Sequence, residues 1–328
     1  MKEILNNLLT HQPLAREESR QVLMELASGR HNVAQVASVL TVYLMRPVTV
    51  EELAGFREAM LELCIPVRFD RPVMDVCGTG GDGKNTFNIS TLTAFIVAAA
   101  GQPVAKHGNY GVSSVCGSSN ILEYFGFRFT SDFDELRRQL DRANICFLHA
   151  PLFHPAMKNV APVRKDLGIK TFFNMLGPLV NPAFPVYQFT GVFSLELARK
   201  YGYLLQQTDL QFMVVHSLDG YDEVSLTGPY KYYSTAGEGI GTPEELGFTY
   251  VNEASIAGGN TVEESAAVFL NVLQGKATDE QHNVVIANAA LALRCARPDS
   301  PMDELVDLAR ETLLSGKAAL AFRKLLEM

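Results

Sequence analysis

The sequence predicts an α/β protein with a small all-helical domain and a large α/β domain built on a mostly parallel central sheet. Residues 1 to about 65 show helical periodicity only, and roughly the last seventy residues are helical again. From about residue 72, short apolar runs alternate with helical segments. Such alternation is typical of a parallel sheet with helices on its faces. We therefore expect a helical domain at 1–66 and an α/β domain at 67–328.

The amino-terminal domain has the signals of short helices joined by short connections. An apolar face at 23–27 is closed by Gly29, and 33–45 forms a second apolar segment that is opened by Asn32. The sequence Thr-Val-Glu-Glu at 49–52 matches a capping box, in which the Thr and Glu side chains each bond the other residue's main-chain N–H group. This box predicts a third helix that ends near Pro66.

The α/β domain contains five apolar runs with strand-like composition, at 73–77, 103–105, 146–148, 187–193 and 212–216. Helical segments are expected at 90–100, 132–143 and 196–207, and capping boxes at 261–264 and 278–281 open carboxyl-terminal helices. The stretch 172–185 carries three prolines, which disfavour a long helix or a central strand. We expect it to be an ordered crossing segment, with part of 168–186 joining the helical domain.

Composition limits the possible functions. The chain has 328 residues and a formal net charge of −8, which argues against nonspecific nucleic-acid binding. Its five cysteines are scattered and form no C-x-x-C pair, as expected for reduced thiols. The amino terminus lacks the pattern of a signal peptide, and the longest small-apolar stretch, 92–100, is too short to span a bilayer. We expect a cytoplasmic protein that binds any anionic ligand through local main-chain amides, a few cations or a metal.

A glycine-rich loop, GTGGDG at 78–83, follows the first predicted strand and matches two nucleotide-binding patterns incompletely. A dinucleotide fold needs an acidic residue about 20 positions later, and 98–106 contains none. A P-loop needs Ser or Thr after its lysine, where this chain has Asn85, and Asp82 inside the loop would repel phosphate. Both interpretations are therefore disfavoured.

The same loop still predicts a diphosphate site. Glycines let main-chain N–H groups approach an anion, and the following helix begins among hydroxyl and amide side chains at 86–91. A second polar cluster, Lys-His-Gly-Asn at 106–109, follows the next strand and is followed in turn by several serines at 113–119. Ligands of parallel sheets lie beyond the carboxyl ends of the strands, so both clusters are expected at one edge. A histidine alone is most often an ordinary loop residue, but its place in this cluster makes His107 a candidate site residue.

An adjacent acidic pair, Asp222 and Glu223, follows the fifth predicted strand. Two neighbouring carboxylates repel each other unless water or a cation separates them, and for a surface pair solvation is the default explanation. Here the pair follows a strand in a chain that still needs a cation for a diphosphate. Mg²⁺ binds carboxylates together with substrate phosphates, so the pair predicts a Mg²⁺ site.

These motifs together resemble the anthranilate phosphoribosyltransferase family over nearly the whole chain. The matching segments are GTGGD at 78–82, TFNIST at 86–91, KHGN at 106–109, Ser-Ser at 113–114, HPAMKNVAPVRKDLG at 154–168, FNMLGPLVNP at 173–182 and DGYDE at 219–223. The resemblance implies a fold like those of nucleoside phosphorylases and phosphoribosyltransferases, and a homodimer formed through the small domains. It also implies phosphoribosyl transfer to the amine of anthranilate, a step of tryptophan biosynthesis.

The resemblance further implies roles for individual residues. The phosphoribosyl diphosphate donor is expected to contact Gly78, Gly81, Asp82, Thr86, Asn88, Ser90, Thr91, Lys106, Ser114 and Ser118. Mg²⁺ is expected at Ser90, Asp222 and Glu223. Anthranilate is expected at Gly78, His107, Asn109 and Arg164, where a guanidinium suits a carboxylate. His107 is the one catalytic candidate, and no general base is assigned.

The sequence departs from the family pattern at two places. Tyr110 stands where the family commonly has Arg, and Ser119-Asn120 stand where Ala-Asp is common. Each change removes one charge, and the signs are opposite, so the two can compensate. Three alternatives stay open: a pyrimidine nucleoside phosphorylase of the same architecture, a nucleic-acid-binding relative, and a transferase for another aromatic amine that contacts Tyr110.

Overall fold

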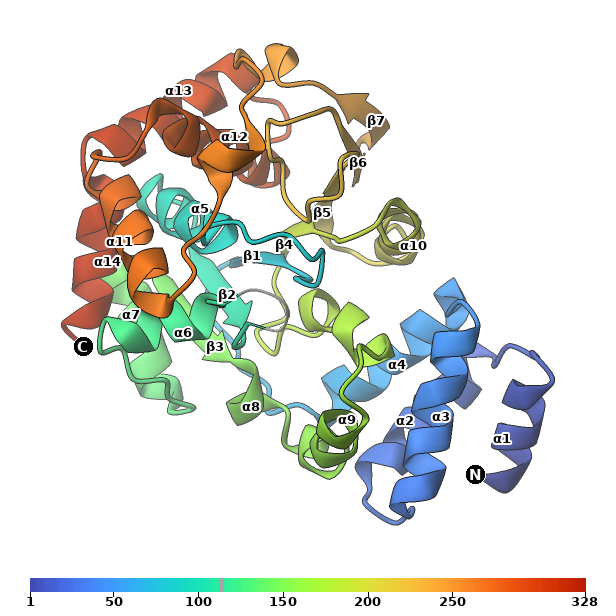
Figure 1. Ribbon diagram of the computed structural model, residues 1–328. Coiled ribbons are helices and arrows are strands. Elements are labelled where there is room, and N and C mark those ends of the chain that lie inside the picture. The colour runs from blue at the N-terminus through green and yellow to red at the C-terminus, as the bar shows by residue number, and fades with distance from the viewer. Residues whose placement is uncertain (112–114) are drawn as a thin grey trace. The chain divides into compact units, whose positions relative to one another are not determined.

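The computed structural model describes residues 1–111 and 115–328, and the chain forms two compact units (Figure 1). The first unit contains Met1–Val67 and Ala150–Phe184, and the second contains Arg68–His149 and Pro185–Met328. The first unit is built from helices, and the second has helices around a sheet. The predicted fold class is therefore confirmed.

The amino-terminal part of the helical unit consists of α1 (Lys2–Leu9), α2 (Arg16–Ala27), α3 (Val33–Met45) and α4 (Val50–Leu63). Asn32 caps α3 by accepting a hydrogen bond from the N–H of Gln35. The predicted capping box at the start of α4 is present, with Glu52 and Thr49 bonding each other's main chain. Helices α2 and α4 pack closely at Gly55, where a Cβ atom would lie 2.1 Å from the carbonyl oxygen of Arg16.

A second segment completes the helical unit and begins earlier than expected, at 150 instead of near 168. It contains α8 (Ala150–Phe153), η1 (Pro155–Asn159), α9 (Ala161–Leu167), η2 (Phe172–Met175) and η3 (Gly177–Leu179). Asn159 donates a hydrogen bond to the carbonyl of Ala27 at 2.7 Å, and the Phe172 ring stacks on Phe56 with centroids 4.4 Å apart. These contacts bind the segment to the earlier helices, and short helical turns replace a long helix in the proline-rich stretch.

The α/β unit is built on a seven-stranded sheet of order β3-β2-β1-β4-β5-β6-β7. Its strands are β1 (Met74–Gly78), β2 (Val104–Gly108), β3 (Ile145–His149), β4 (Tyr187–Gly191), β5 (Gln211–Ser217), β6 (Tyr230–Ser234) and β7 (Gly237–Gly241). The first five pair in parallel and correspond to the five predicted strands, whereas β6 and β7 are antiparallel. The sheet is therefore mostly parallel, as predicted.

The hairpin of β6 and β7 was not predicted. β7 has the sequence Gly-Glu-Gly-Ile-Gly, and glycine is unfavourable in strands. The structure explains the glycines through the register, which places Tyr230 opposite Gly241 and Tyr232 opposite Gly239. A Cβ atom on Gly241 would lie 2.5 Å from the ring carbon Cζ of Tyr230, so the tyrosine rings lie across the glycines. This pairing between strands is not visible in local composition.

The remaining helices of this unit are α5 (Ile89–Ala99), α6 (Ser118–Tyr124), α7 (Phe133–Ala143), α10 (Leu195–Leu205), α11 (Val262–Leu273), α12 (Asp279–Ala296), α13 (Met302–Leu314) and α14 (Lys317–Leu326). Two short 3₁₀ helices, η4 (Glu244–Leu246) and η5 (Glu253–Ile256), precede α11. Helices α5 and α12 lie beside each other in the core, as Figure 1 shows, and Phe95 of α5 packs edge-on against Phe322 of α14. None of the described helices is both long and apolar enough to cross a bilayer.

The strand order reverses at β1, and this reversal positions the site. From β1 the chain proceeds through β2 to β3 on one side, whereas β4 and β5 pair on the other side. β1 pairs with β4 along its whole length, from Met74 to Gly78, but with β2 only where Met74 meets Val104. In open α/β sheets, ligands bind beyond the carboxyl ends of the strands at such a reversal.

Candidate active site

The glycine loop begins where β1 ends and is shaped by main-chain conformations that favour glycine. Gly80, Gly81 and Gly83 have φ angles of 62°, 82° and 77°. The N–H of Gly80 donates to Oδ2 of Asp222 at 2.6 Å. At Gly78 a Cβ atom would lie 2.7 Å from the same Oδ2 atom, so the loop approaches this carboxylate closely because Gly78 has no side chain.

The acidic pair lies against this loop. Glu223 accepts hydrogen bonds from the N–H of Ser90 and from the hydroxyl of Thr86, both at 3.3 Å. Asp82 accepts a hydrogen bond from the N–H of Asp222 at 3.4 Å. The structure therefore brings together the loop after β1, the start of α5 and the loop after β5, which the sequence predicted to share one edge.

Crowding of carboxyl groups changes the acidity of the pair. Burial raises the pKa of Asp222 to about 7, and the charge of Asp82 acts in the same direction. Burial likewise raises the pKa of Glu223 well above its usual range, reinforced by Asp222 and Asp82. Asp222 is buried and Glu223 is partly exposed, and both resist ionisation beside a third carboxyl group. A cation bound at such a place lowers the free energy of the ionised state.

The ligand atoms at this place suit Mg²⁺. They are carboxylate oxygens of Asp222 and Glu223, together with the Ser90 hydroxyl, for which the described residues provide no hydrogen-bond partner. Hard oxygen ligands of this kind are those that Mg²⁺ prefers. Within residues 1–111 and 115–328, no three His, Cys, Asp or Glu side chains are arranged to enclose a metal. The protein would therefore supply part of a coordination shell, leaving positions for water and phosphate.

Lys106 brings a positive charge to the same region from the end of β2. Its side chain is 2% exposed, and its ammonium group donates to the carbonyl of Val76. Burial lowers the pKa of Lys106, and among the charges that oppose this shift is that of Glu223. Asp82, Lys106 and Glu223 therefore face one region, as a single diphosphate site requires.

The start of α5 contributes further polar groups. Asn88 is the N-cap residue, and its side-chain amide donates to the carbonyl of Cys116 at 2.8 Å. Its side-chain oxygen is buried and has no partner among the described residues. Thr91 is buried in the first turn. The amino terminus of α5 thus lies at the site with a partial positive charge that favours anions.

The KHGN segment is fixed by contacts with its surroundings. The main-chain N–H of His107 donates to Asp75, and the carbonyl of Asn109 accepts a hydrogen bond from the Ser118 hydroxyl at 3.3 Å. Gly108 leaves room for this serine, because a Cβ atom there would lie 2.4 Å from Ser118 Oγ. The predicted donor residue Ser114 lies outside the described residues. Asp75, a buried residue inside a strand, was not among the residues that the sequence motifs singled out.

Tyr110 at the first departure from the family pattern makes contacts of its own. Its hydroxyl donates to Glu123 at 2.8 Å, and its ring packs edge-on against His149 with centroids 4.9 Å apart. At the second departure, the side-chain oxygen of Asn120 accepts hydrogen bonds from the N–H groups of Gly111 and Gly117, each at 3.0 Å. Neither position leaves an unpaired charge, so the two neutral replacements are compatible with one ordered arrangement on either side of 112–114.

Arg164 lies in the helical unit, on α9. Its guanidinium donates to the side-chain oxygen of Asn174 at 3.4 Å and lies 5.2 Å from the centre of the Phe173 ring. Burial lowers the pKa of Arg164, and no carboxylate among the described residues pairs with it. A partly buried guanidinium without an acidic partner is suited to binding the carboxylate of a ligand.

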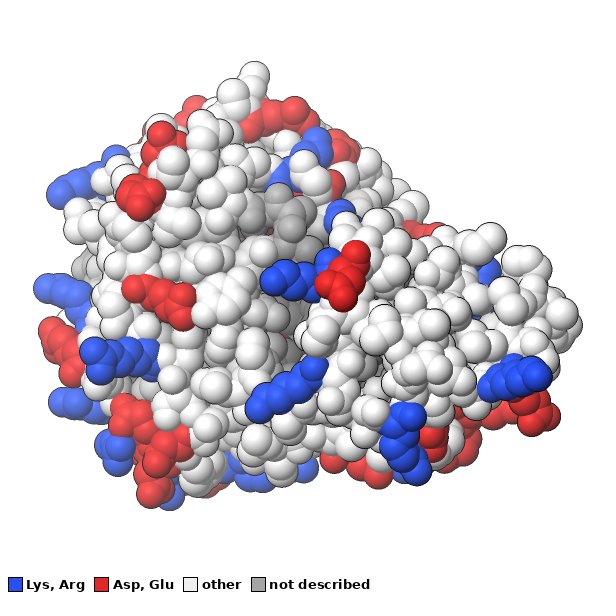
Figure 2. Space-filling view, turned by 60° about the horizontal axis from the view of Figure 1, so that its bottom comes forward, with Lys and Arg blue, Asp and Glu red and all other residues white. Residues whose placement is uncertain are grey.

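The surface charges show no nucleic-acid pattern on the face drawn in Figure 2. There, among the described residues, basic and acidic side chains are interspersed with uncharged ones and form no continuous basic stripe. Nucleic-acid backbones require a concentration of Lys and Arg. This distribution agrees with the net charge of −8.

Comparison with known proteins gives matches over the whole chain. The model of the glycosyl transferase family α/β domain matches residues 70–319, and that of the family's helical bundle domain matches residues 2–64. Anthranilate phosphoribosyltransferase of Flavobacterium johnsoniae is 54% identical, with 100% of this chain and 99% of the relative covered. The enzyme of Christiangramia forsetii is 55% identical, with coverage of 99% and 98%.

Solved structures agree with these relatives. The crystal structure of anthranilate phosphoribosyltransferase from Thermus thermophilus has a TM-score of 0.91 at 35% identity, covering 98% of each chain. That of the Saccharomyces cerevisiae enzyme in complex with PRPP and Mg has a TM-score of 0.90 at 27% identity, covering 98% of this chain and 96% of that one. With full-length relatives above half identity and both domain models matched, the chain belongs to the anthranilate phosphoribosyltransferase family.

Proposed function

We propose that this enzyme transfers the phosphoribosyl group from 5-phosphoribosyl 1-diphosphate to the amine of anthranilate. The products are N-(5-phosphoribosyl)anthranilate and diphosphate, and the reaction is a step of tryptophan biosynthesis. The observation that carries the proposal is the meeting of the glycine loop, Lys106 and the Asp222–Glu223 pair at one edge of the sheet. These are the elements that a metal-bound diphosphate requires.

The donor would be held through its phosphates by groups from three segments. Main-chain N–H groups of the glycine loop, the amino terminus of α5 and the Lys106 ammonium all attract anions. The donor contacts that we propose are Gly78, Gly81, Asp82, Thr86, Asn88, Ser90, Thr91, Lys106, Ser114 and Ser118. As the bond to the anomeric carbon breaks, negative charge gathers on the departing diphosphate. The main-chain N–H groups, the amino terminus of α5 and the Lys106 ammonium are already in place to stabilise this charge.

Asp222, Glu223 and Ser90 would hold Mg²⁺ against the donor. A bound Mg²⁺ ion supplies additional neutralisation of the diphosphate charge. The yeast relative has been solved in complex with PRPP and Mg, which supports this assignment. The Asp222 carboxyl must lose its proton before it binds a metal, so its raised pKa should make Mg²⁺ binding depend on pH.

The acceptor would be positioned by Arg164 and Asn109, with Gly78 and His107 nearby. Arg164 lacks an acidic partner among the described residues, and the anthranilate carboxylate would supply one. The yeast relative has also been solved in complex with 4-fluoroanthranilate. An aromatic amine is neutral at pH 7 and can attack without prior proton removal, so orientation is the main requirement. His107 is retained as a candidate catalytic residue.

An activity assay tests the proposed reaction. The enzyme is mixed with anthranilate, 5-phosphoribosyl 1-diphosphate and Mg²⁺, and the loss of anthranilate fluorescence is followed. Loss of signal that depends on all three additions supports the proposal. Release of bases from pyrimidine nucleosides with free phosphate, without turnover of anthranilate, would instead identify a nucleoside phosphorylase. Turnover of another aromatic amine in preference to anthranilate would show a changed acceptor.

We also propose a homodimer formed through the helical unit. Apolar side chains are exposed on α3 and close to its ends, with exposed fractions of 62% for Val33, 44% for Leu44 and 74% for Met45. Sedimentation velocity of the full chain and of the Met45→Glu variant tests this surface.

A cytoplasmic location is proposed from the five cysteines, which are all buried and free of disulfides.

A further inference from the structure

Asp75 is a carboxylate enclosed within the sheet, shortly before the glycine loop. It lies on β1 and is 0% exposed. One oxygen, Oδ1, accepts a hydrogen bond from the main-chain N–H of His107 at 3.1 Å, and the other accepts one from the Cys77 thiol at 3.5 Å. Isolated buried charges are strongly unfavourable, so this position, which an apolar residue could fill, requires a compensating role.

The pairing of the strands shows what Asp75 does for β2. β2 pairs with β3 at every residue from Val104 to Gly108, but with β1 only at Val104. Among the described residues, no main-chain pairing with β1 is recorded for β2 beyond Val104, toward the ends that carry the glycine loop and the KHGN segment. In this region the N–H of His107 meets the Asp75 carboxylate in place of a main-chain carbonyl of β1. Asp75 thus links β2 to β1 beyond their recorded main-chain pair.

The residue before His107 is Lys106, and Asp75 also acts on its charge. The Lys106 ammonium is buried and has a neutral partner, the carbonyl of Val76. The groups whose charges act on it are Cys77 and Asp75 of β1 and Glu223 of the loop after β5. Burial raises the pKa of the Cys77 thiol well above its usual range, so the thiol is neutral at pH 7. Asp75 is then the carboxyl group of β1 whose charge favours the protonated form of Lys106.

We propose that Asp75 is a positioning residue for donor binding: it fixes the end of β2 against β1 and provides the counter-charge of the Lys106 ammonium. The inference rests on the proposed function, in which Lys106 binds the diphosphate of the donor. Asp75 itself need not touch either substrate. Its effect reaches the reaction through the charge of Lys106 and through the position of the main chain at 106–107.

The test replaces the charge but keeps the shape, in the variant Asp75→Asn. We expect the KM for the diphosphate donor to rise about tenfold, equivalent to ~1.4 kcal/mol, while the KM for anthranilate changes little. The pH profile should also change, because Lys106 without its counter-charge loses its proton at lower pH. The rise of donor KM with increasing pH should therefore begin at a lower pH than in the wild type. A residue with a purely structural role would not move this profile.

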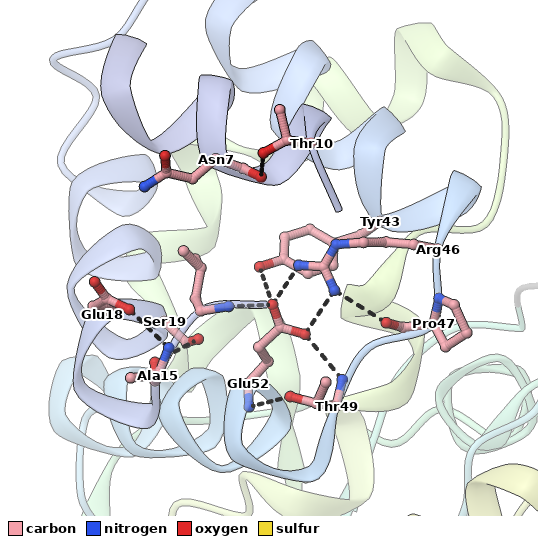
Figure 3. A network of polar contacts seen from close by, with 11 residues as sticks. Asn7, Thr10, Ala15, Glu18, Ser19, Tyr43, Arg46, Pro47, Thr49 and Glu52 are labelled. Carbon is pink, nitrogen blue, oxygen red and sulfur yellow. Dashed lines mark hydrogen bonds and ion pairs between the residues drawn. The ribbon is translucent and has the colours of Figure 1, made fainter. Parts of the chain in front are cut away.

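Glu52 offers a matched control. It is a second carboxylate with 0% exposure, it lies in the helical unit, and it accepts hydrogen bonds from Leu14, Tyr43, Arg46 and Thr49 (Figure 3). Glu52→Gln should lower the melting temperature without changing the donor KM or its pH profile. If Asp75→Asn has the same effects as Glu52→Gln, the proposal is wrong. Asp75→Ser, which also removes the charge, allows the same measurement if the Asn variant does not fold.

A third variant separates this inference from the proposed function. Lys106→Met removes the ammonium group itself and should raise the donor KM at least as much as Asp75→Asn. A normal donor KM in Lys106→Met would overturn the donor site. A raised KM in Lys106→Met together with a normal KM and pH profile in Asp75→Asn would leave the donor site in place and overturn the role of Asp75.

Discussion

At the scale of single residues, Arg164 is a cation without an acidic partner in the described part of the chain. Replacing Arg164 with Ala should raise the KM for anthranilate about tenfold or more, because a charged hydrogen bond to the substrate carboxylate is lost. The KM for the diphosphate donor should stay within about twofold. The neighbouring Lys165, which is exposed, supplies the control variant Lys165→Ala. Equal changes in both KM values would contradict the role of Arg164.

The Asp222 carboxyl gives a prediction about pH. Its pKa is raised to about 7 by burial and by Asp82, so below that pH it carries a proton that competes with a metal. The Mg²⁺ concentration for half-maximal activity should therefore fall as the pH rises from about 6 to about 8. Activity measured against Mg²⁺ at several pH values checks this. A half-maximal concentration that is constant with pH, or that rises, would remove Asp222 from the metal site.

Site residues could be predicted from the sequence where the residues next to them along the chain form a recognisable motif. The glycine loop, KHGN and the acidic pair could be recognised because each lies at the end of an apolar strand or shortly after it. Asp75 and Glu123 could not, because their partners, His107 and Tyr110, are far from them along the chain. The signal that could have found Asp75 is its type: an acid in the middle of an otherwise apolar strand.

At the scale of elements, the glycine loop packs closely against the loop that carries the acidic pair. Gly78→Ala introduces a methyl group that crowds Asp222, because a Cβ atom at this position would lie 2.7 Å from Oδ2. We expect this variant to need more Mg²⁺ for activity, because Asp222 must move. Measurement of activity against Mg²⁺ concentration checks the effect.

Gly83 provides the control for this substitution. A Cβ atom on Gly83 would meet nothing within 4 Å, although its φ of 77° still makes alanine strained, by about 1–2 kcal/mol. Gly83→Ala should therefore lower stability with little change in the Mg²⁺ requirement. If Gly83→Ala raises the requirement as much as Gly78→Ala, backbone strain in the loop would explain both results, and contact with Asp222 would not be the cause.

Elements were predictable where their signals are local. The caps at Asn32, Thr49, Thr261 and Thr278 all accept hydrogen bonds at the helix starts that the sequence indicated. The β6–β7 hairpin was missed because its stability comes from tyrosine rings that lie on glycines of the partner strand. Short helices at 150–167 were missed because their packing against α2 and α3 depends on contacts between distant segments.

At the scale of the whole molecule, the buried acids should couple stability to pH. The folded-state pKa of Asp222 lies above its ordinary value, so its contribution to stability is fully present at low pH and is lost as the pH rises through about 7. In the absence of Mg²⁺, the wild type should thus lose more stability between about pH 5 and about pH 8 than Asp222→Asn does. Thermal unfolding of both proteins at several pH values checks this. A smaller loss in the wild type than in the variant would contradict the assignment.

Magnesium should reverse this trend. An ion that binds the ionised carboxylates stabilises the folded state, and does so more at about pH 8 than at about pH 5. Such binding would explain how a molecule with a net charge of −8 binds an anionic donor, because the metal neutralises the acidic groups at the site. The described residues place few cations at the site, where Lys106 lies together with main-chain amides.

We propose that main-chain amides, Lys106 and a metal held by Asp222 and Glu223 bind the diphosphate donor together. Isothermal titration calorimetry with 5-phosphoribosyl 1-diphosphate, with and without Mg²⁺, tests it most directly when the wild type is compared with the Asp222→Asn, Glu223→Gln double variant. We expect Mg²⁺ to strengthen donor binding by the wild type, about tenfold or more, and to have little effect on the double variant. Equal enhancement by Mg²⁺ in both proteins, or none in the wild type, would contradict the claim.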